Sequence, residues 1–161
     1  MVGYTTGGSF STAMAASGTT SGTGTVFLAT KFGTNFAFRV TTTASNGYNA
    51  VTNNTSQTVD SLCIMGATNT NTTTGLTQYM NGNAFAGNNG TTISAKGVTI
   101  GALINNMWSW EGYISEILIY SDVLSTTDRQ SVEGYLAWKW GINTSLPSSH
   151  PYYSTEFSYG S

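Results

Sequence analysis

Short runs of β-branched and aromatic residues recur along the chain, separated by clusters of Asn, Gly and Thr. Within one run, Phe36, Phe38 and Val40 alternate with Ala37 and Arg39, as in a strand that buries one face. Short alternating runs between turn residues are typical of antiparallel β proteins. The pattern therefore predicts strands at residues 25–30, 36–43, 58–68, 76–80, 98–103 and 112–120.

The dipeptide Asn81-Gly82 is the strongest turn signal between two of these runs. Both residues tolerate the positive φ angles that a type I′ hairpin turn requires. We therefore expect residues 76–80 to pair with residues at about 83–86.

The predicted strand at residues 112–120 is apolar on both faces. Ile117 and Ile119 lie on one face of a regular strand, and Leu118 and Tyr120 lie on the other. Strands that are buried on both faces have this composition, so we expect this strand in the centre of its sheet.

A single long helix is predicted over residues 126–140. Ser125 is a favourable N-cap, Asp128 follows close to a capping-box position, and Gly141 favours a helix end. The expected apolar stripe of this helix consists of Val132 and Leu136 with Trp140 or Tyr135.

The two ends of the chain carry weaker patterns. Residues 1–24 contain mostly Gly, Ser, Thr and Ala, which predicts a loop, a weak edge strand or an arm. In residues 146–152, Pro147 and Pro151 favour an extended segment, which we expect to pack back along the domain. We therefore expect one folded unit at residues 25–153, followed by a tail at residues 154–161.

Composition narrows the classes of function. The 161 residues fit one domain, and 39% apolar and 12% aromatic residues provide a core although only 7% of residues are charged. Five Lys and Arg residues and a net charge of −2 give no basic stripe for phosphates. Nucleic acid and anionic membranes are therefore not expected partners.

The residue types that bind metals are isolated along the chain. Cys63 is the only cysteine, so no intrachain disulfide can form, and its apolar neighbours predict a buried thiol. His150, the only histidine, has neither cysteine nor clustered carboxylates near it in sequence. We therefore predict no metal site and no cofactor.

Residues 110–125 combine Trp110, Gly112 and Glu116 with an apolar strand and a Leu-Ser turn. This combination resembles the closing strand of laminin G-like and pentraxin-like domains. Residues 128–141 and the Leu-Pro-Ser-Ser-His-Pro-Tyr segment at 146–152 resemble the C-terminal helix and tail of concanavalin A-like domains. Such domains are common in phage and giant-virus structural proteins and in large bacterial surface proteins.

This resemblance covers residues 97–153, with a looser match back to Thr25. It implies an all-β fold, an antiparallel β-sandwich of the jelly-roll type with one C-terminal α-helix. It also implies structural roles for Trp110, Gly112, Glu116, Trp138 and Trp140.

The chain departs from this family before Thr25, where family members usually have further strands. Two alternatives follow: a shortened sandwich that a neighbouring chain completes, or a fragment of a longer protein. A missing strand leaves an open sheet edge, and open edges pair with other chains. We therefore expect a homo-oligomer or an association with other virion subunits.

A catalytic role is not expected. Glycoside hydrolysis, the most plausible chemistry on such a fold, needs two carboxylates roughly 5 to 10 Å apart. Glu111 and Glu116 are five positions apart and therefore lie on opposite faces of a regular strand. Glu116 matches a family position whose acid is usually hydrogen-bonded within the sandwich.

Sugar binding requires less: an aromatic ring for the apolar face of the sugar, and amides or hydroxyls for its OH groups. Asn105, Asn106 and Trp108, in the loop before the closing strand, supply that combination, and Tyr48 in an Asn-rich loop is a second candidate. The alternative for Trp108 is a cover for the core or a subunit contact.

These patterns predict a non-enzymatic structural module at a virion surface or outside the cell, such as a capsid decoration, fibre or appendage subunit. The alternative is a lectin-like carbohydrate-binding module for attachment to host glycans.

Overall fold

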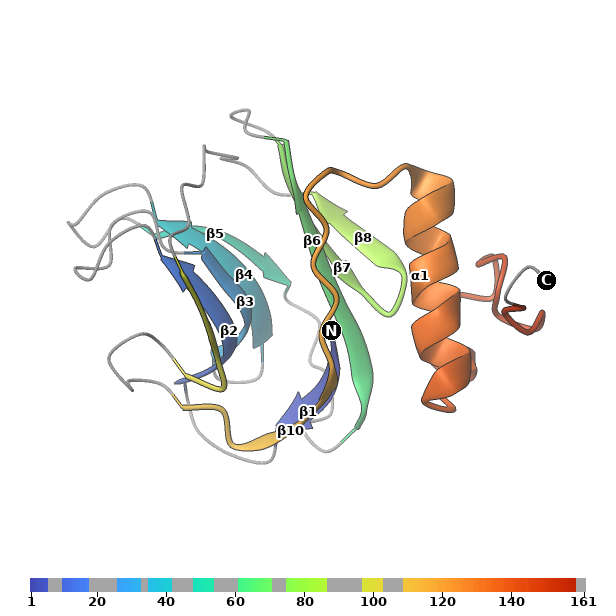
Figure 1. Cartoon of the computed structure of the whole chain (residues 1–161), viewed down its shortest axis with the longest axis horizontal. Helices are drawn as coiled ribbons and strands as arrows, with labels where there is room; N and C mark the ends of the chain where they lie inside the picture. Colours follow the sequence, from blue (N-terminus) through green and yellow to red (C-terminus); the bar gives the residue numbers. More distant parts are fainter. Residues whose placement is uncertain are drawn as a thin grey trace.

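The computed structural model describes residues 1–5, 10–17, 26–32, 35–41, 48–53, 61–70, 75–86, 97–102 and 109–158. These ranges contain antiparallel strands, one C-terminal α-helix and a short 3-10 helix (Figure 1). The expectation of a mostly β chain with a single C-terminal helix is confirmed for this part.

The first sheet is built on a three-stranded antiparallel meander. It consists of β6 (Cys63–Asn69), β7 (Leu76–Met80) and β8 (Asn83–Ala86). Two further strands, β1 (Val2–Thr5) and β10 (Gly112–Glu116), extend it to the order β10-β1-β6-β7-β8.

The second sheet has the order β5-β4-β3-β2-β9. Its strands are β2 (Phe10–Ser17), β3 (Val26–Phe32), β4 (Asn35–Thr41), β5 (Tyr48–Asn53) and β9 (Gly97–Ile100). Strand β3 approaches β6, and β5 approaches β7 and β8. Strands β6–β8 therefore lie between this sheet and the helix α1 (Thr126–Lys139) (Figure 1).

The turn between β7 and β8 confirms the predicted hairpin. Asn81 and Gly82 have φ angles of 47° and 79°, as a type I′ turn requires. The Asn81 side chain is enclosed, and its Oδ1 accepts a hydrogen bond of 2.8 Å from the Ile64 amide. The hairpin turn is thereby attached to the first residues of β6.

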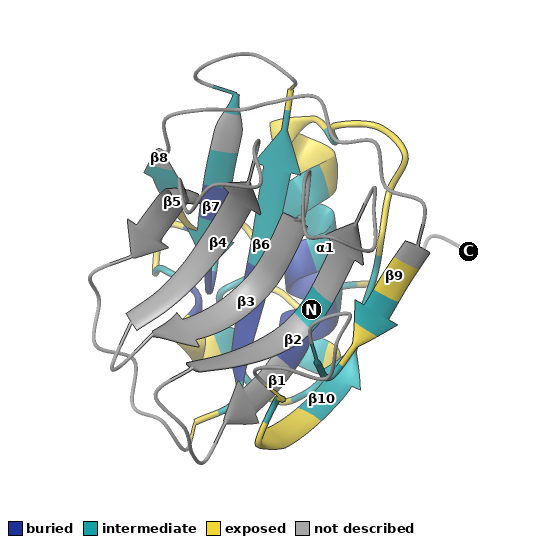
Figure 2. Cartoon of the chain, turned by 90° about the vertical axis from the view of Figure 1, so that its left-hand side faces the viewer, coloured by how far each residue is buried: buried dark blue, intermediate teal, exposed yellow. Residues whose placement is uncertain are grey.

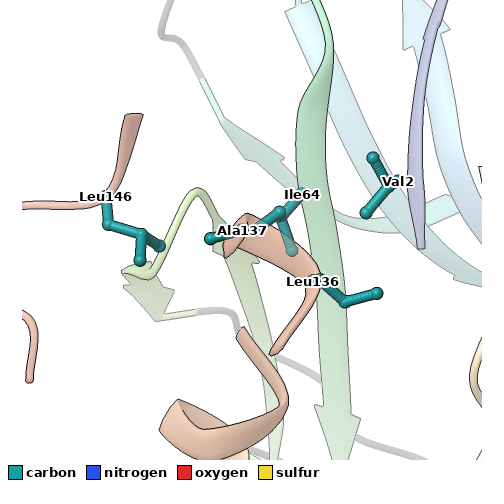
Figure 3. Packing of buried hydrophobic residues seen from close by; sticks show 5 residues of the cluster. All are labelled: Val2, Ile64, Leu136, Ala137 and Leu146. Atoms are coloured by element: carbon teal, nitrogen blue, oxygen red, sulfur yellow. The ribbon is translucent and has the colours of Figure 1, made fainter. Parts of the chain in front are cut away.

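One face of β6 packs against α1. The buried side chains there form a cluster of Val2, Ile64, Leu136, Ala137 and Leu146, called here the helix-side core (Figure 3). Burying a side chain of the size of Leu or Ile contributes roughly 1.5–3 kcal/mol. The cluster therefore joins β1, β6, the helix and the tail into one packed unit.

The other face of β6 is buried as well. Cys63 and Met65 are enclosed, as is Met80, which stands opposite Met65 on β7. Because side chains alternate along a strand, Cys63 and Met65 point away from Ile64 and therefore away from the helix. Strand β6 is thus covered on both faces.

The helix has the predicted ends. Ser125 Oγ accepts a hydrogen bond of 3.1 Å from the Asp128 amide and donates one of 2.6 Å to the Asp128 carboxylate. Gly141, with φ of 66°, follows the C-cap residue Trp140. Within the expected stripe, Leu136 is buried, and Val132, Tyr135 and Trp140 pack at its margin.

The segment after the helix packs back on the domain, but it is not extended. The 3-10 helix η1 (Asn143–Ser145) leads to buried Leu146, and two turns follow. In these turns the His150 amide donates to the Pro147 carbonyl at 2.8 Å, and the Tyr153 amide donates to the His150 carbonyl at 3.0 Å. The prediction of an extended segment was wrong because proline also suits the start of a turn.

The prediction of a loop, edge strand or arm at residues 1–24 is wrong for the described part of that segment. Strand β1 lies between β10 and β6, and β2 lies between β3 and β9, so both are internal. Val2 is fully buried in the helix-side core. A four-residue strand with one large buried side chain is too short to show a periodic pattern.

Strand β10 is shorter and more peripheral than predicted. It ends at Glu116, where its pairing with β1 stops at Val2, and it is the outermost strand of its sheet. Residues 117–120 form no regular strand. Leu118 nevertheless packs against the helix-side core, which accounts for part of the apolar pattern at residues 112–120.

The enclosure of Cys63 predicts an unreactive thiol. Burial raises the pKa of Cys63 to about 12, so almost no reactive thiolate exists at pH 8. We expect an aromatic disulfide reagent at that pH to label native protein far more slowly than protein in 6 M guanidinium chloride. Since this is the only cysteine, the absorbance reports on Cys63 alone. Equal labelling rates in the two states would contradict the packing described for this face of β6.

Candidate functional site

A buried polar group joins the helix to the tail. Oε1 of Glu133 on α1 accepts a hydrogen bond of 2.6 Å from the Arg129 guanidinium, and Oε2 lies 3.1 Å from His150 Nε2. The side chains of Glu133 and His150 are 6% and 2% exposed. We call Arg129, Glu133 and His150 the tail cluster.

The hydrogen bonds of the tail cluster define the state of the imidazole. His150 Nδ1 faces the Tyr152 amide at 3.2 Å, and a backbone N–H can only donate, so Nδ1 is the acceptor. The proton of the neutral ring is therefore on Nε2, which donates to Glu133. The charge of Glu133 is balanced by Arg129, whose guanidinium also lies 4.1 Å from the ring centroid of Tyr79 on β7.

Two glycines make room for the tail. A Cβ on Gly82 would lie 3.1 Å from His150 Cδ2 and 3.2 Å from Pro147 Cδ, and one on Gly134 would overlap the ring of Tyr152. The hairpin and the helix can thus approach the tail closely only because these positions have no side chain. Trp138 Nε1 adds a hydrogen bond of 2.9 Å to the Tyr152 carbonyl.

A second polar group joins β10 to the helix. Glu116 accepts from the Tyr135 hydroxyl at 2.8 Å and from Trp140 Nε1 at 3.0 Å, and it pairs with Lys139 at 3.1 Å. Lys139 also donates to the Tyr135 hydroxyl at 2.6 Å. Strand β10 is therefore attached to the last turn of α1.

These contacts shift the titration of the two charged partners. Burial acts to raise the pKa of Glu116, but hydrogen bonds from Trp140, Tyr135 and Lys139 outweigh it, and the pKa lies below its ordinary value. Hydrogen bonds with Tyr135 and Glu116 raise the pKa of Lys139. Both groups are charged at neutral pH.

The chemistry open to these groups is limited. The carboxylates of Glu116 and Glu133 accept hydrogen bonds from side chains of α1 and the tail, and these bonds connect β10 and the tail to the helix. In the described part of the chain, no three His, Cys, Asp or Glu side chains gather as a metal site would require. No helix in the same ranges is long and apolar enough to cross a membrane.

The predicted sugar-binding residues are not brought together by the described structure. Asn105, Asn106 and Trp108 lie outside the described residues. Tyr48 was expected in a loop, but it is the first residue of β5, paired with Thr41 of β4. Ala50, Val51 and Thr52 continue that strand, and the surrounding asparagines concealed its short β pattern.

The residues with expected structural roles occupy contact positions. Trp110 is partly enclosed, and its amide donates to the Gly101 carbonyl at 2.7 Å, which connects the end of β9 to the start of β10. Gly112 begins β10, while Trp138 and Trp140 bond to the tail and to Glu116. These positions are consistent with packing roles.

Several large apolar side chains of the described residues are exposed. Among the described residues, the large ones with the highest exposure are Val98, Ile100, Tyr113, Ile119, Tyr120 and Val123. They belong to β9, β10 and the segment before α1, and Figure 2 shows exposed residues on β9 and β10 in yellow. We call this set the apolar rim.

The sequence contains little sign of the tail cluster. Glu133 and His150 are 17 positions apart, and they meet only because the tail turns back at Pro147. Gly82 and Gly134 were the available signals, since glycine inside a helix or next to a tail can mark a close approach. Neither signal identifies the residue that approaches.

Comparison of the chain with protein-family models, curated proteins and solved structures finds no significant match.

The tail cluster predicts a large stability cost for Glu133→Ala. The change leaves half-buried Arg129 and buried His150 without their acceptor, and breaking a buried ionic pair costs about 3–5 kcal/mol. We expect a loss of that order in the free energy of unfolding, measured in urea. The matched change Glu156→Ala, in an exposed part of the tail, should alter it by less than about 0.5 kcal/mol. Similar small effects of both changes would show that the cluster does not hold the tail.

Glu116 predicts an acid-sensitive share of the stability. The pKa of Glu116 in the folded protein is lower than in the unfolded chain, where it is about 4.3. The stability that its ionised carboxylate contributes is therefore complete above about pH 4.3 and is lost as pH falls through the lower pKa of the folded state. We expect Glu116→Gln to lower Tm most at pH 7, and the difference from the unaltered protein to shrink below about pH 4. Glu156→Gln is the control and should change Tm little. A Tm difference for Glu116→Gln that stays constant from pH 7 to pH 3 would disprove this role.

Proposed function

We propose that this chain is a non-enzymatic structural module of a virion or surface assembly, such as a decoration, fibre or appendage subunit. The apolar rim carries this proposal, because large apolar side chains that stay exposed in one chain gain free energy when another subunit covers them. Ile100 and Ile119 are 63% and 65% exposed, and both gain most from burial against another subunit.

The arrangement of strands supports a sandwich of the concanavalin A-like, jelly-roll type. The two antiparallel sheets approach at β3 and β6, and the C-terminal helix and tail cover the outer face of β6. This agrees with the features expected from residues 97–153. The proposal of a particle-exposed or extracellular location follows from that resemblance and from the low charge of the chain.

The polar groups support a structural rather than a catalytic role. Glu116 and Glu133 are the most enclosed carboxylates of the described residues, and each one connects two elements of the fold. A catalytic acid must instead reach a bound substrate. The carbohydrate-binding alternative depends on residues outside the described part and becomes an outcome of the test.

The proposal predicts self-assembly through the apolar rim. Light scattering coupled to size exclusion should give a mass above that of one chain at micromolar concentration. Ile100→Lys should weaken the assembly by about tenfold or more, since a charge replaces roughly 1.5–3 kcal/mol of apolar burial. Thr144→Lys, on the exposed surface of η1, is the matched control and should assemble normally.

A monomer at every concentration would contradict this proposal. A monomer that also binds selectively on a glycan array, and loses that binding on Trp108→Ala, would support the lectin-like alternative instead.

A further inference from the structure

Both ring nitrogens of His150 are engaged inside the fold. Nδ1 accepts a hydrogen bond of 3.2 Å from the Tyr152 amide, and Nε2 lies 3.1 Å from the Glu133 carboxylate, to which it donates. The His150 side chain is 2% exposed, so both nitrogens depend on these protein groups. The arrangement fits the neutral ring that carries its proton on Nε2.

A second proton on the ring would disturb this arrangement in two ways. A charged imidazole donates from both nitrogens, so Nδ1–H would face the N–H of Tyr152 and their hydrogen bond would be lost. The ring would also bring a second positive charge to Glu133, which already pairs with Arg129 at 2.6 Å. Attraction to Glu133 offsets part of this cost but does not restore the lost bond. The docked tail and a second ring proton therefore compete for Nδ1.

The elements packed against the imidazole do not supply a balancing charge. From α1, the ring faces Glu133 and, through it, Arg129, whose guanidinium lies over the Tyr79 ring of β7. The hairpin approaches the ring with uncharged Gly82, and the tail approaches it with Tyr152. In the part of the chain that the structure describes, no second carboxylate joins Glu133 at the ring. Protonation would thus leave the tail cluster with an excess positive charge in a largely buried place.

The contacts of the tail show how much of it depends on this ring. Leu146 is buried in the helix-side core and should remain there. Beyond it, Trp138 Nε1 bonds to the Tyr152 carbonyl at 2.9 Å, and the Phe157 ring packs 5.5 Å from the Tyr152 ring, between centroids. These contacts all involve Tyr152, whose amide bonds to the imidazole. Losing that bond therefore weakens the attachment of the tail beyond Leu146 and not of the helix itself.

We propose that His150 is a pH-sensitive switch: protonation of its ring releases residues 147–158 from α1 and from the β7–β8 hairpin, while α1 and the sheets stay folded. A free imidazole takes up its proton at about pH 6.5. Because the released tail binds one more proton than the docked tail, docking is complete well above that pH and is lost as pH falls below it. Release exposes the face of α1 around Gly134 and Trp138, which the tail covers. This inference goes beyond the proposed function and does not depend on it.

Amide hydrogen exchange of the tail at pH 7.5 and pH 5, measured by NMR and corrected for intrinsic exchange rates, tests the switch. We expect the protection of the Tyr152 amide to be about tenfold lower at pH 5. The Trp138 indole N–H should lose protection in the same range, because its acceptor leaves with the tail. The Ile142 amide, which donates to the Ala137 carbonyl at 2.8 Å, is the internal control and should keep its protection.

A variant that cannot titrate separates the imidazole from other acid effects. In His150→Asn, the side-chain oxygen can accept from the Tyr152 amide, as in an Asx-turn. We expect the protection of Tyr152 in this variant to be equal at the two pH values. Glu156→Gln, which removes an exposed carboxylate of the same tail, is the matched control and should retain the pH dependence. If His150→Asn does not dock its tail at pH 7.5, the comparison of Tyr152 with Ile142 in the unaltered chain decides.

The protonation state of the ring can be read directly, because His150 is the only histidine and gives one pair of imidazole ¹⁵N signals. At pH 7.5 these should show a bare Nδ1 and a protonated Nε2. The opposite tautomer would overturn the inference. So would Tyr152 protection that is the same at both pH values, an equal loss at Ile142, or the same pH dependence in a docked His150→Asn variant.

Discussion

Strand β6 has apolar side chains to bury on both faces, and the rest of the described structure is arranged around that requirement. Ile64 packs into the helix-side core, while Cys63 and Met65 are enclosed on the face toward the second sheet. Covering the first face requires α1, and covering the second requires the approach of β3. A chain with 7% charged residues has few charges to orient its surface, and burying both faces of one central strand gives it a stable core.

Polar contacts then determine where the helix lies. Glu133 bonds to the tail through His150, and Glu116 bonds β10 to the last helical turn through Tyr135 and Trp140. Ionic groups of this kind often add little net stability relative to apolar contacts. Their directional bonds nevertheless specify one orientation of α1 on the sheet, which apolar packing alone specifies less well.

Local signals in the sequence were sufficient for some elements. Asn81-Gly82 determined the hairpin, and Ser125 with Gly141 determined both ends of the helix, because each residue acts through its own backbone. Strands β1 and β5 escaped prediction because four to six residues rich in Gly, Thr and Asn show no clear alternation. The strand over residues 112–120 was predicted too long, since a sequence pattern cannot show where pairing stops.

The candidate site was harder to predict than the fold. The tail cluster joins residues far apart in sequence, and its formation depends on turns at Pro147. Five of the six residues of the apolar rim lie in runs that were predicted to be strands, and Val123 lies outside them. The exposure of Val98, Ile100 and Tyr113 follows from the outermost positions of β9 and β10. The suggested sugar-binding residues Asn105, Asn106 and Trp108 lie outside the described residues, so their role stays a prediction.

The central claim is that α1 and the second sheet cover the two faces of β6. Amide hydrogen exchange, measured by NMR at single-residue resolution, tests it most directly. The amides of Gly66 and Thr68 point to β7 and should exchange about as slowly as the whole protein unfolds. Exchange of these two amides that is orders of magnitude faster than global unfolding would contradict a covered β6.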